Sequence, residues 1–559
     1  MTGAREALAW WQGAVVYQIY PRSYCLADPS GRRARLALGA GSPPDRVRDG
    51  AGDLEGIRRH LDHVAELGAD AIWLSPIYPS PMADFGYDVA DYCGIDPLFG
   101  DLDTFDALLA DAHDRSIRVL LDWVPNHTSD RHPWFEDARR SRTSAHRDWY
   151  VWRDPDPLDP ARPPNNWKRA FGEGPAWTFD ELTGQWYLHL FLPEQPDLNW
   201  ATPEVVEAME GVLDFWLARG VDGFRIDVVH GLGKPPELDD VPDAQADIPY
   251  SALNDHDSTH PILRRLRAHV DRWPQQPLLV GEVFLIDAGK VAKYYGNGDE
   301  LHLAFNFAPM FSPFSGVSFR RRLEEIEATL GPVDAWPTWV LSNHDRPRHR
   351  TRFGGSERRA RAAAVLSIGM RGTVFLYAGE ELGLEDTEIP DELAVDPGGR
   401  DGCRAPIPWD ASAEHGWALG GSEAWLPFAP NATTLNVANE ARDDSSVLAL
   451  YQRLIEFRRR SSALFDGDLQ LLEAGPEEVL AFRRGRREKA FAEAGEGEVV
   501  VLVNFSDVEQ PVDEALSGPW VVEVGSGGEG SLTTEHELFA GRLGPEEAVI
   551  LRRPDRGAR

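Results

Sequence analysis

Four short segments of the chain hold carboxylate, histidine and arginine side chains of the kinds that perform chemistry. They are Asp-Trp-Val-Pro-Asn-His at 122–127, Gly-Phe-Arg-Ile-Asp at 223–227, Gly-Glu at 281–282 and Ser-Asn-His-Asp at 342–345. Three of these segments end an apolar run with a carboxylate, at Asp227, Glu282 and Asp345. Two carboxyls can flank a glycosidic bond as nucleophile and acid/base, and a third can stabilise the cation-like transition state.

Arg225 and Asp227 have the spacing of two side chains on one face of a strand. Residues two apart in a strand point the same way, so the guanidinium is expected beside the carboxylate. An adjacent positive charge favours the ionised carboxylate, which a nucleophile requires. A purely structural ion pair would explain this segment if it stood alone, but it occurs together with the other three.

Glu282 and two histidines extend the set. Glu282 ends an apolar run, where loss of solvent favours the protonated form that a proton donor needs. Asp345 follows His344, and a His-Asp pair can hold neighbouring sugar hydroxyls. His127 repeats this chemistry after an earlier run. A metal site at these histidines is disfavoured, because they follow different runs and form no His-x-x-x-His pair.

A scaffold must bring the ends of these runs together, and the wider pattern of the chain indicates one. Amphipathic stretches such as 54–67, 104–116, 203–219 and 356–370 alternate with short apolar runs. The runs are 15–20, 71–75, 119–124, 223–229, 278–283, 301–307, 338–342 and 373–377. Strands alternating with helices in this number are typical of a (β/α)₈ TIM barrel, whose catalytic side chains follow the C-terminal strand ends. We therefore predict an α/β fold of this kind.

Two regions depart from the barrel pattern. Nearly a hundred residues separate the third and fourth runs, and a structureless loop of that length is improbable in a compact domain. Beyond about residue 466, short alternating runs separated by turn residues indicate an all-β unit. We predict a barrel over 1–127 and 201–465, with an irregular extension at 383–445, an inserted domain at 128–200 after strand three, and a C-terminal β-sandwich at 466–559.

Composition limits the partners and the compartment. The 559 residues carry a formal charge of −34, which disfavours binding to nucleic acid and to anionic membranes. No apolar run approaches the ~18 residues of a membrane span, and the N-terminus has no convincing cleavage signal. Three cysteines far apart, Cys25, Cys93 and Cys403, suit a reducing compartment. We expect a cytoplasmic monomer or homodimer without nucleic-acid or membrane partners.

Taken in order, the four segments resemble the motifs of the α-amylase family, glycoside hydrolase family 13. Other stretches are similar to its oligo-1,6-glucosidase and α-glucosidase branch. They are Trp-Trp followed by Val-Val-Tyr-Gln-Ile-Tyr-Pro-Arg-Ser within 10–23, Asp-Phe-Gly-Tyr-Asp-Val-Ala-Asp-Tyr at 84–92, Gln-Pro-Asp-Leu-Asn-Trp at 195–200, and Gly-Arg-Asp-Gly-Cys-Arg-Ala-Pro-Ile-Pro-Trp at 399–409. The resemblance covers nearly the whole chain.

The resemblance implies an exo-acting, retaining α-glucosidase that acts on short oligosaccharides or disaccharides of the maltose, isomaltose or sucrose type. Asp227 would be the nucleophile, Glu282 the acid/base and Asp345 the stabiliser of the transition state. The implied substrate-binding residues are Asp88, Tyr87, His127, Phe171, Arg225, Val228, Phe307, His344 and Arg400. Asp88, His127, Arg225 and His344 would surround one non-reducing glucose, with Phe171 and Phe307 as aromatic walls, while Arg400 would close the pocket and border the +1 site, which Val228 would shape. Of these, Tyr87 would be the stacking platform, and Val228 directly after the nucleophile tends to accompany α-1,6 activity. No organic cofactor is implied.

A structural cation is a further expectation from the resemblance. The branch often carries a Ca²⁺ or Mg²⁺ loop of the form Asp-x-Asn-x-Asp-Gly-x-Gly-Asp, and the corresponding stretch here is 45–53. Asp45, Asp49, Asp53 and the Ala51 carbonyl could supply oxygen ligands, whereas Val47 replaces the middle amide. An occupied loop and an empty loop both stay open.

Two other functions stay open beside the leading one. The first is a transglucosidase or sugar isomerase on the same scaffold, since a sugar hydroxyl can replace water as the acceptor. The second is a non-catalytic scaffold similar to transporter-associated heavy chains. Such proteins usually lose the catalytic carboxylates and carry a membrane anchor, whereas this chain keeps all three carboxylates.

Overall fold

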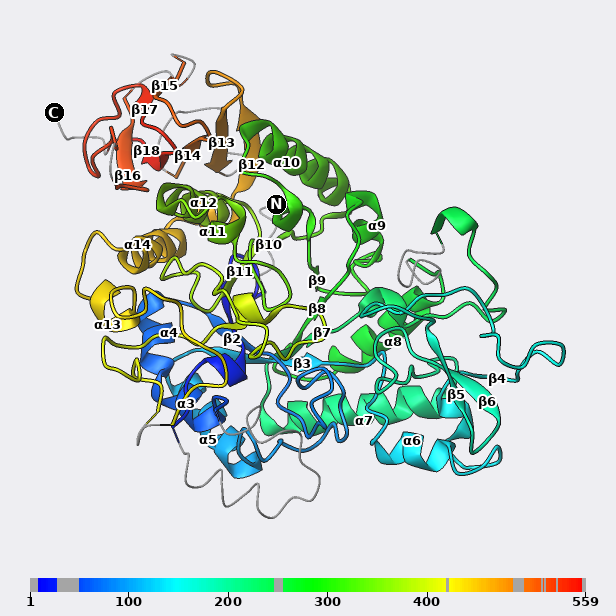
Figure 1. Ribbon diagram of the computed structural model, residues 1–559. Coiled ribbons are helices and arrows are strands. Elements are labelled where there is room, and N and C mark those ends of the chain that lie inside the picture. The colour runs from blue at the N-terminus through cyan, green and yellow to red at the C-terminus, as the bar shows by residue number, and fades with distance from the viewer. Residues whose placement is uncertain are drawn as a thin grey trace.

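The computed structural model describes residues 9–27, 50–245, 255–418, 422–485, 497–513, 516, 519–528 and 531–554. Its centre is a sheet of eight parallel strands (Figure 1). The strands are β1 (Val15–Ile19), β2 (Ala71–Leu74), β3 (Arg118–Trp123), β7 (Gly223–Ile226), β8 (Leu278–Gly281), β9 (Leu303–Ala304), β10 (Thr338–Val340) and β11 (Thr373–Tyr377). Every one of them falls within or next to a predicted apolar run, and the predicted α/β barrel is confirmed.

The two end strands of the sheet, β9 and β10, are joined by a side-chain contact. The strand order is β10-β11-β1-β2-β3-β7-β8-β9, so β9 and β10 stand at its two ends. The Thr338 hydroxyl donates to the Ala304 carbonyl at 2.8 Å and accepts from the Asn306 N–H at 3.0 Å. A threonine at the start of β10 therefore joins the two ends.

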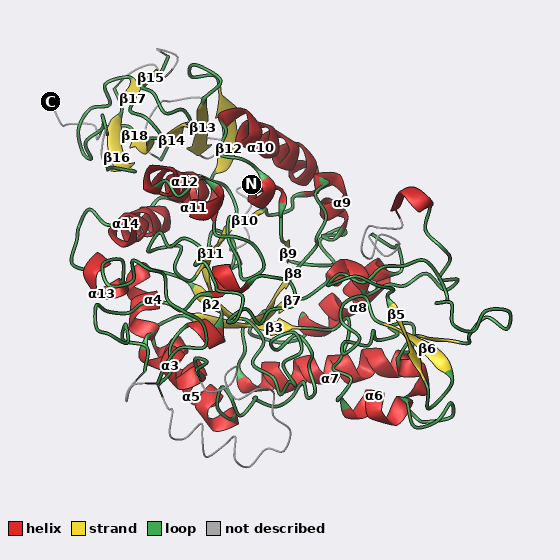
Figure 2. Ribbon diagram, viewed as in Figure 1, coloured by secondary structure: helices red, strands yellow, loops and turns green. Residues whose placement is uncertain are grey.

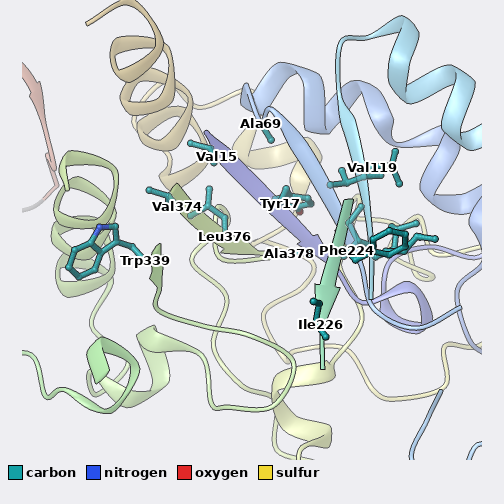
Figure 3. Packing of buried hydrophobic residues seen from close by; sticks show 14 of the residues in the cluster. Val15, Tyr17, Ala69, Val119, Phe224, Ile226, Trp339, Val374, Leu376 and Ala378 are labelled. Atoms are coloured by element: carbon teal, nitrogen blue, oxygen red, sulfur yellow. The ribbon is translucent and has the colours of Figure 1, made fainter. Parts of the chain in front are cut away.

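Strand side chains alternate between two apolar layers, as the period of two requires. On β1, Val15, Tyr17 and Ile19 belong to the large core between the strands and the helices, whereas Val16 belongs to the cluster inside the barrel. Figure 3 shows side chains of the outer layer, among them Val15, Tyr17, Phe224 and Ile226. These runs are almost continuously apolar because both faces of the sheet are covered.

Helices surround the strands (Figure 2). Those of the barrel are α3 (Leu54–Arg59), α4 (Leu61–Leu67), α5 (Leu102–Asp114), α7 (Pro203–Arg219), α8 (Thr259–Val270), α9 (Ala288–Lys293), α10 (Gly316–Leu330), α11 (His349–Arg352), α12 (Glu357–Gly369) and α14 (Val447–Arg460). In α7, Pro203 occupies the first turn and Gly220 ends the helix at φ 104°, where a residue without a Cβ is favoured. Within the described ranges, no helix is long and apolar enough to cross a membrane.

The region between β3 and β7 has its own small sheet and core. It contains α6 (Pro133–Ala138) and the antiparallel strands β4 (Trp152–Arg153), β6 (Gln185–Leu188) and β5 (Trp177–Asp180), in that spatial order. Trp167, Trp177 and Trp186 pack in one cluster there. Lys234, which follows β7 and whose side chain is 7% exposed, pairs with Asp197 at 3.0 Å and thereby ties this region to the barrel.

The C-terminal region is all-β. Its five-stranded antiparallel sheet has the order β12-β13-β14-β18-β16, with β12 (Asp468–Leu472), β13 (Val479–Gly485), β14 (Val499–Asn504), β18 (Ala548–Arg552) and β16 (Val521–Gly525). A second sheet pairs β15 (Gln510–Pro511) with β17 (Arg542–Leu543). Helix α12 packs against β14 and β18, so this region lies on the barrel through α12 (Figure 1).

Glu380 is a buried carboxyl that follows β11, and it predicts how stability depends on pH. It is 2% exposed, its carboxylate accepts from the Tyr451 hydroxyl of α14 at 3.1 Å, and burial raises its pKa from 4.5 to about 7. Between these values the folded protein keeps a proton that the unfolded chain has released, so stability is lost as pH rises through this window.

Replacing this carboxyl with an amide should therefore flatten the pH dependence of unfolding. As the pH rises from 4.5 to 7.5, the wild type should lose on the order of 2–3 kcal/mol of unfolding free energy through this carboxyl. Glu380→Gln should not show this loss, because an amide does not titrate. Urea unfolding at the two pH values measures the difference. Glu388→Gln, which changes an exposed residue in the same loop, is the control. An unchanged pH slope in Glu380→Gln would contradict the assignment.

Candidate active site

A cavity of about 340 Å³ lies among the residues that follow the C-terminal strand ends. Asp227 follows β7, Glu282 follows β8 and Asp345 comes shortly after β10, which is the end of a TIM barrel where catalytic groups gather. The structure brings nine of the predicted site residues to the cavity wall: Tyr87, His127, Phe171, Asp227, Val228, Glu282, Phe307, Asp345 and Arg400.

Arg225 lies beneath the cavity and connects the acidic residues. It is 1% exposed, and its Nη1 lies 2.8 Å from Asp122 Oδ1 and 2.6 Å from Asp227 Oδ1. Its Nη2 lies 2.9 Å from Glu282 Oε2. One planar guanidinium thus fixes the nucleophile candidate and the acid/base candidate relative to each other, which a flexible lysine would do less well.

The protonation of this group differs from the simple expectation for Arg225 beside Asp227. Burial raises the pKa of Asp227 well above its ordinary value, and the charges of Glu282 and Asp122 add to the rise against the opposing effect of Arg225. The raised pKa of Asp227 therefore follows from its burial and from the two neighbouring carboxylates that share one guanidinium with it.

Val228 has a strained backbone beside this pair. Its φ of 46° and ψ of 44° lie in the left-handed region, which a β-branched residue rarely adopts. In this conformation the Val228 N–H donates to Glu282 Oε2 at 3.1 Å, while the residue lines the cavity. Strain of this kind is typical of functional sites.

Asp345 is held by two arginines and also contacts His344. Its Oδ1 lies 2.9 Å from Arg400 Nη1 and 3.2 Å from Arg404 Nη2, and its Oδ2 lies 3.3 Å from His344 Nε2. Burial alone would raise the pKa of Asp345, but the positive charges of Arg400, Arg404 and Arg225 hold it well below the usual range. Asp345 is therefore an ionised carboxylate, suited to stabilising positive charge.

His344 orients neighbouring groups and lies behind the cavity wall. Its Nδ1 is 2.7 Å from Gln18 Nε2, and its Nε2 is 2.6 Å from the Tyr87 hydroxyl. Burial lowers the pKa of His344 to about 3, so the ring is neutral. The Tyr87 hydroxyl also donates to Asp122 Oδ2 at 3.0 Å, which fixes Tyr87 at the base of the cavity.

The predicted role of Asp88 needs a correction, because the structure places Asp84 at the cavity instead. Asp88 is fully buried, and its carboxylate accepts from the Ser80 hydroxyl and from the N–H groups of Ala83 and Asp84 at 2.9–3.0 Å. Asp88 therefore stabilises the fold of the loop to which it belongs. Asp84 lines the cavity and lies 2.6 Å from Arg400 Nη2.

Other wall residues were not predicted from the sequence: Asp84, Ala170, Phe191, His230, Phe284, Asn343, Arg346 and Gly398. Some lie beside recognised motifs, since Phe284 comes two residues after Glu282 and Arg346 directly follows Asp345. The Arg346 guanidinium lies 5.2 Å from the ring centre of Phe284 and 5.0 Å from that of Phe311. Closeness to a recognised motif was the only feature of the sequence that could have indicated these wall residues, because their residue types alone do not distinguish them.

The predicted cation loop is only partly described. Asp45 and Asp49 lie outside the described residues, and Ala51 is buried. Asp53 begins α3, where its Oδ1 accepts from the N–H groups of Gly56 at 2.7 Å and Ala27 at 3.1 Å. In the parts of the chain that are described, no three His, Cys, Asp or Glu side chains form a metal-binding group. The cation stays a prediction.

Comparisons with known proteins agree with this geometry. Residues 18–467 match the family described as "Alpha amylase, catalytic domain". A probable alpha-glucosidase of Rhizobium meliloti is 39% identical, over 89% of this chain and 90% of its own. An oligo-1,6-glucosidase of Parageobacillus thermoglucosidasius is 33% identical, over 89% of this chain and 91% of its own.

Solved structures extend the likeness to the whole fold. An alpha-glucosyl transfer enzyme superposes with a TM-score of 0.84 at 36% identity, covering 98% of this chain and 100% of its own. The trehalulose synthase of Pseudomonas mesoacidophila gives 0.83 at 30% identity, covering 98% and 99%.

A TIM barrel with paired carboxyls at its C-terminal strand ends and a C-terminal β domain defines a class of glycosidases. Within that class, the chain belongs to the alpha-amylase family, glycoside hydrolase family 13. It is a glycoside hydrolase, and the curated relatives above support its placement beside the glucosidases of the family.

Proposed function

We propose that the chain is an exo-acting, retaining α-glucosidase that releases glucose from the non-reducing ends of short α-glucosides. The observation that carries this proposal is the Asp84–Arg400 ion pair at 2.6 Å in the cavity wall. Such a pair closes one side of the site and favours a pocket for a chain end over a groove for a polymer. The volume of about 340 Å³ is near the lower end of the ~300–1,000 Å³ range of ligand pockets.

In the proposed reaction, Asp227 attacks the anomeric carbon while Glu282 protonates the departing glycosidic oxygen. The bond to the leaving sugar breaks, and a β-glucosyl ester forms on Asp227. Glu282, now ionised, takes a proton from water, whose oxygen displaces Asp227 and gives α-glucose. Asp345 stabilises the positive charge that develops on the ring. The mechanism uses no organic cofactor.

Ring recognition is assigned to residues around this centre. We assign the binding of hydroxyls of one glucose to Arg400 and Asp84, which are paired in the cavity wall, and His127 and Tyr87 line the same cavity. Phe171 and Phe307 supply apolar surface. Asp84 replaces Asp88 in this set for the reason given above.

A second candidate is transfer of the glucosyl group to a sugar acceptor. Support comes from the structural neighbours described as an alpha-glucosyl transfer enzyme and a trehalulose synthase. The rings of Phe284 and Phe307, with the Arg346 guanidinium beside Phe284, offer surface on which an acceptor ring could stack in competition with water.

A proton NMR time course with maltose, isomaltose and sucrose in separate samples tests both candidates. For the hydrolase, the glucose cut from the non-reducing side is expected first as the α-anomer. The only other product should be the leaving sugar, which is fructose from sucrose and the reducing-end glucose from maltose or isomaltose. With sucrose, whose only glucose comes from the cleaved bond, early β-glucose would contradict retention. New glycosidic anomeric signals with any of the three sugars would favour transfer. Absence of any change with all three sugars would refute the proposed substrate class.

Linkage preference is proposed to depend on Val228, whose side chain lines the cavity next to the nucleophile. We expect Val228→Thr to shift the isomaltose/maltose ratio of kcat/KM toward maltose by about tenfold, because one side chain in such a subsite is worth ~1–3 kcal/mol. Both residues are β-branched, so the strained backbone is matched. A ratio unchanged from the wild type would refute this role.

A further inference from the structure

Asp396 is a buried carboxylate beside the site that the reaction above does not use. It lies in the segment after β11, and its side chain is fully buried. It is not among the residues that line the cavity. A buried carboxylate is costly unless it is paired and hydrogen-bonded, so its partners indicate its purpose.

Asp396 makes a bidentate contact with Arg400. Arg400 donates from Nε to Asp396 Oδ2 at 2.9 Å and from Nη2 to Oδ1 at 2.7 Å. The backbone N–H of Arg400 donates to Oδ2 at 2.8 Å. Parallel contacts of this kind fix the plane of a guanidinium, so Arg400 Nη1 is aimed at Asp345.

The same carboxylate also holds a second arginine. Arg404, which is 1% exposed, donates from Nη1 to Asp396 Oδ1 at 3.0 Å. It also donates from Nε to the His344 carbonyl at 2.7 Å and from Nη2 to Asp345 Oδ1 at 3.2 Å. Arg400 and Arg404 therefore converge on the same oxygen of Asp345 and on the same oxygen of Asp396.

Two guanidinium groups that meet at one oxygen repel each other. Asp396 Oδ1 contacts both groups, at 2.7 and 3.0 Å, and its negative charge offsets this repulsion. Without the charge of Asp396, Asp345 Oδ1 would be the one carboxylate oxygen that contacts both Arg400 and Arg404, at 2.9 and 3.2 Å. One arginine would then be expected to leave.

The backbone around Asp396 is fixed as well. Asp401 Oδ2 accepts from the N–H groups of Val395 at 2.7 Å and Asp396 at 3.0 Å. The Gly398 N–H donates to Asp396 Oδ2 at 2.9 Å, and Gly398 lines the cavity. These hydrogen bonds fix the turn that carries Asp396, so its carboxylate has a defined position.

We propose that Asp396 is the positioning residue for Asp345. It holds Arg400 and Arg404 so that both bind Asp345 Oδ1, which directs Oδ2 of Asp345 toward the sugar. This role rests on the proposed glucosidase function and deepens it. Asp396 itself touches neither the substrate nor the reacting atoms.

The kinetic test uses Asp396→Asn, with Asp391→Asn as the control, because Asp391 is exposed in the same segment. With p-nitrophenyl α-glucoside and maltose, kcat and kcat/KM of Asp396→Asn should both fall by about 30–100-fold, since an interaction of the transition state is lost. The control should retain wild-type values. A fall in Tm with unchanged kcat would show a merely structural role and overturn the proposal.

A double-mutant cycle isolates the route through Asp345. Asp345→Asn/Asp396→Asn should be no slower than Asp345→Asn alone, whereas multiplied losses would overturn the proposal. Arg404→Lys provides a second variant if Asp396→Asn folds poorly, because one ammonium cannot reproduce the three directed contacts of Arg404. It should show the same joint loss of kcat and kcat/KM, and wild-type kinetics would count against the role.

A crystal structure of Asp396→Asn separates this inference from the proposed function. Displacement of Arg400 or Arg404, with rotation of the Asp345 carboxylate, is expected. Unchanged positions of all three side chains would overturn the positioning role whether or not the protein hydrolyses glucosides. Failure of the wild type to release glucose would refute the function alone.

Discussion

Asp227→Ala should lower kcat on maltose and on p-nitrophenyl α-glucoside by at least about 10⁴-fold, the scale on which loss of a nucleophile is felt. The reason is geometric. Arg225 Nη1 holds the Asp227 carboxylate at 2.6 Å, and this carboxylate lines the cavity, where it can reach the anomeric carbon. The fold should persist, since Arg225 keeps Asp122 and Glu282 as partners. Steady-state kinetics and far-UV circular dichroism measure the two expectations.

Chemical rescue makes the same prediction more specific. In Asp227→Gly, azide can occupy the vacated space and attack the anomeric carbon from the side of the missing carboxylate. The product should be β-glucosyl azide, because a single displacement inverts the α-configuration. Asp114→Ala, at an exposed helix position, is the control and should be fully active. Wild-type activity in Asp227→Ala, or α-glucosyl azide from Asp227→Gly, would overturn the assignment of the nucleophile.

The barrel could be predicted from the sequence because its strands are buried on both faces and its helices are amphipathic. These features are local patterns, and each of the eight apolar runs contains all or most of one strand. The predicted helix at 54–67 is instead two helices that break at His60, whose ring stacks on Trp409 at 3.5 Å. That partner is far away in the sequence, so no local pattern could reveal the break.

The site could be predicted where a motif fixes both the residue and its strand, and less well where a loop decides the geometry. Asp84 and Asp88 belong to the same loop, and only its fold turns Asp88 inward and Asp84 toward Arg400. The protonation of Asp227 likewise depends on the three carboxylates gathered around Arg225. Asp396 carried no motif of its own, and its contacts with two arginines appear only in three dimensions.

Glu282→Gln should show a loss that depends on the leaving group. With maltose, kcat/KM should fall by about 10³–10⁴-fold, since departure of a sugar hydroxyl requires the proton that Glu282 supplies. With p-nitrophenyl α-glucoside, the first step should be nearly unaffected, because a nitrophenolate leaves without a proton. The amide is nearly isosteric and can still accept from the Val228 N–H, which lies 3.1 Å from the present Oε2.

The second step distinguishes Glu282 from Asp227. Without a base to activate water, the glucosyl ester of Glu282→Gln should accumulate, so stopped-flow mixing with p-nitrophenyl α-glucoside should give a burst of p-nitrophenol equal to the enzyme concentration. Asp227→Ala cannot form the ester and should give no burst, which makes it the matched comparison. Azide should speed turnover of Glu282→Gln and yield α-glucosyl azide, the opposite anomer from that expected with Asp227→Gly. Equal losses on both substrates and no burst would mean that Glu282 is not the acid/base, because only a proton-transfer residue makes the defect follow the basicity of the leaving group.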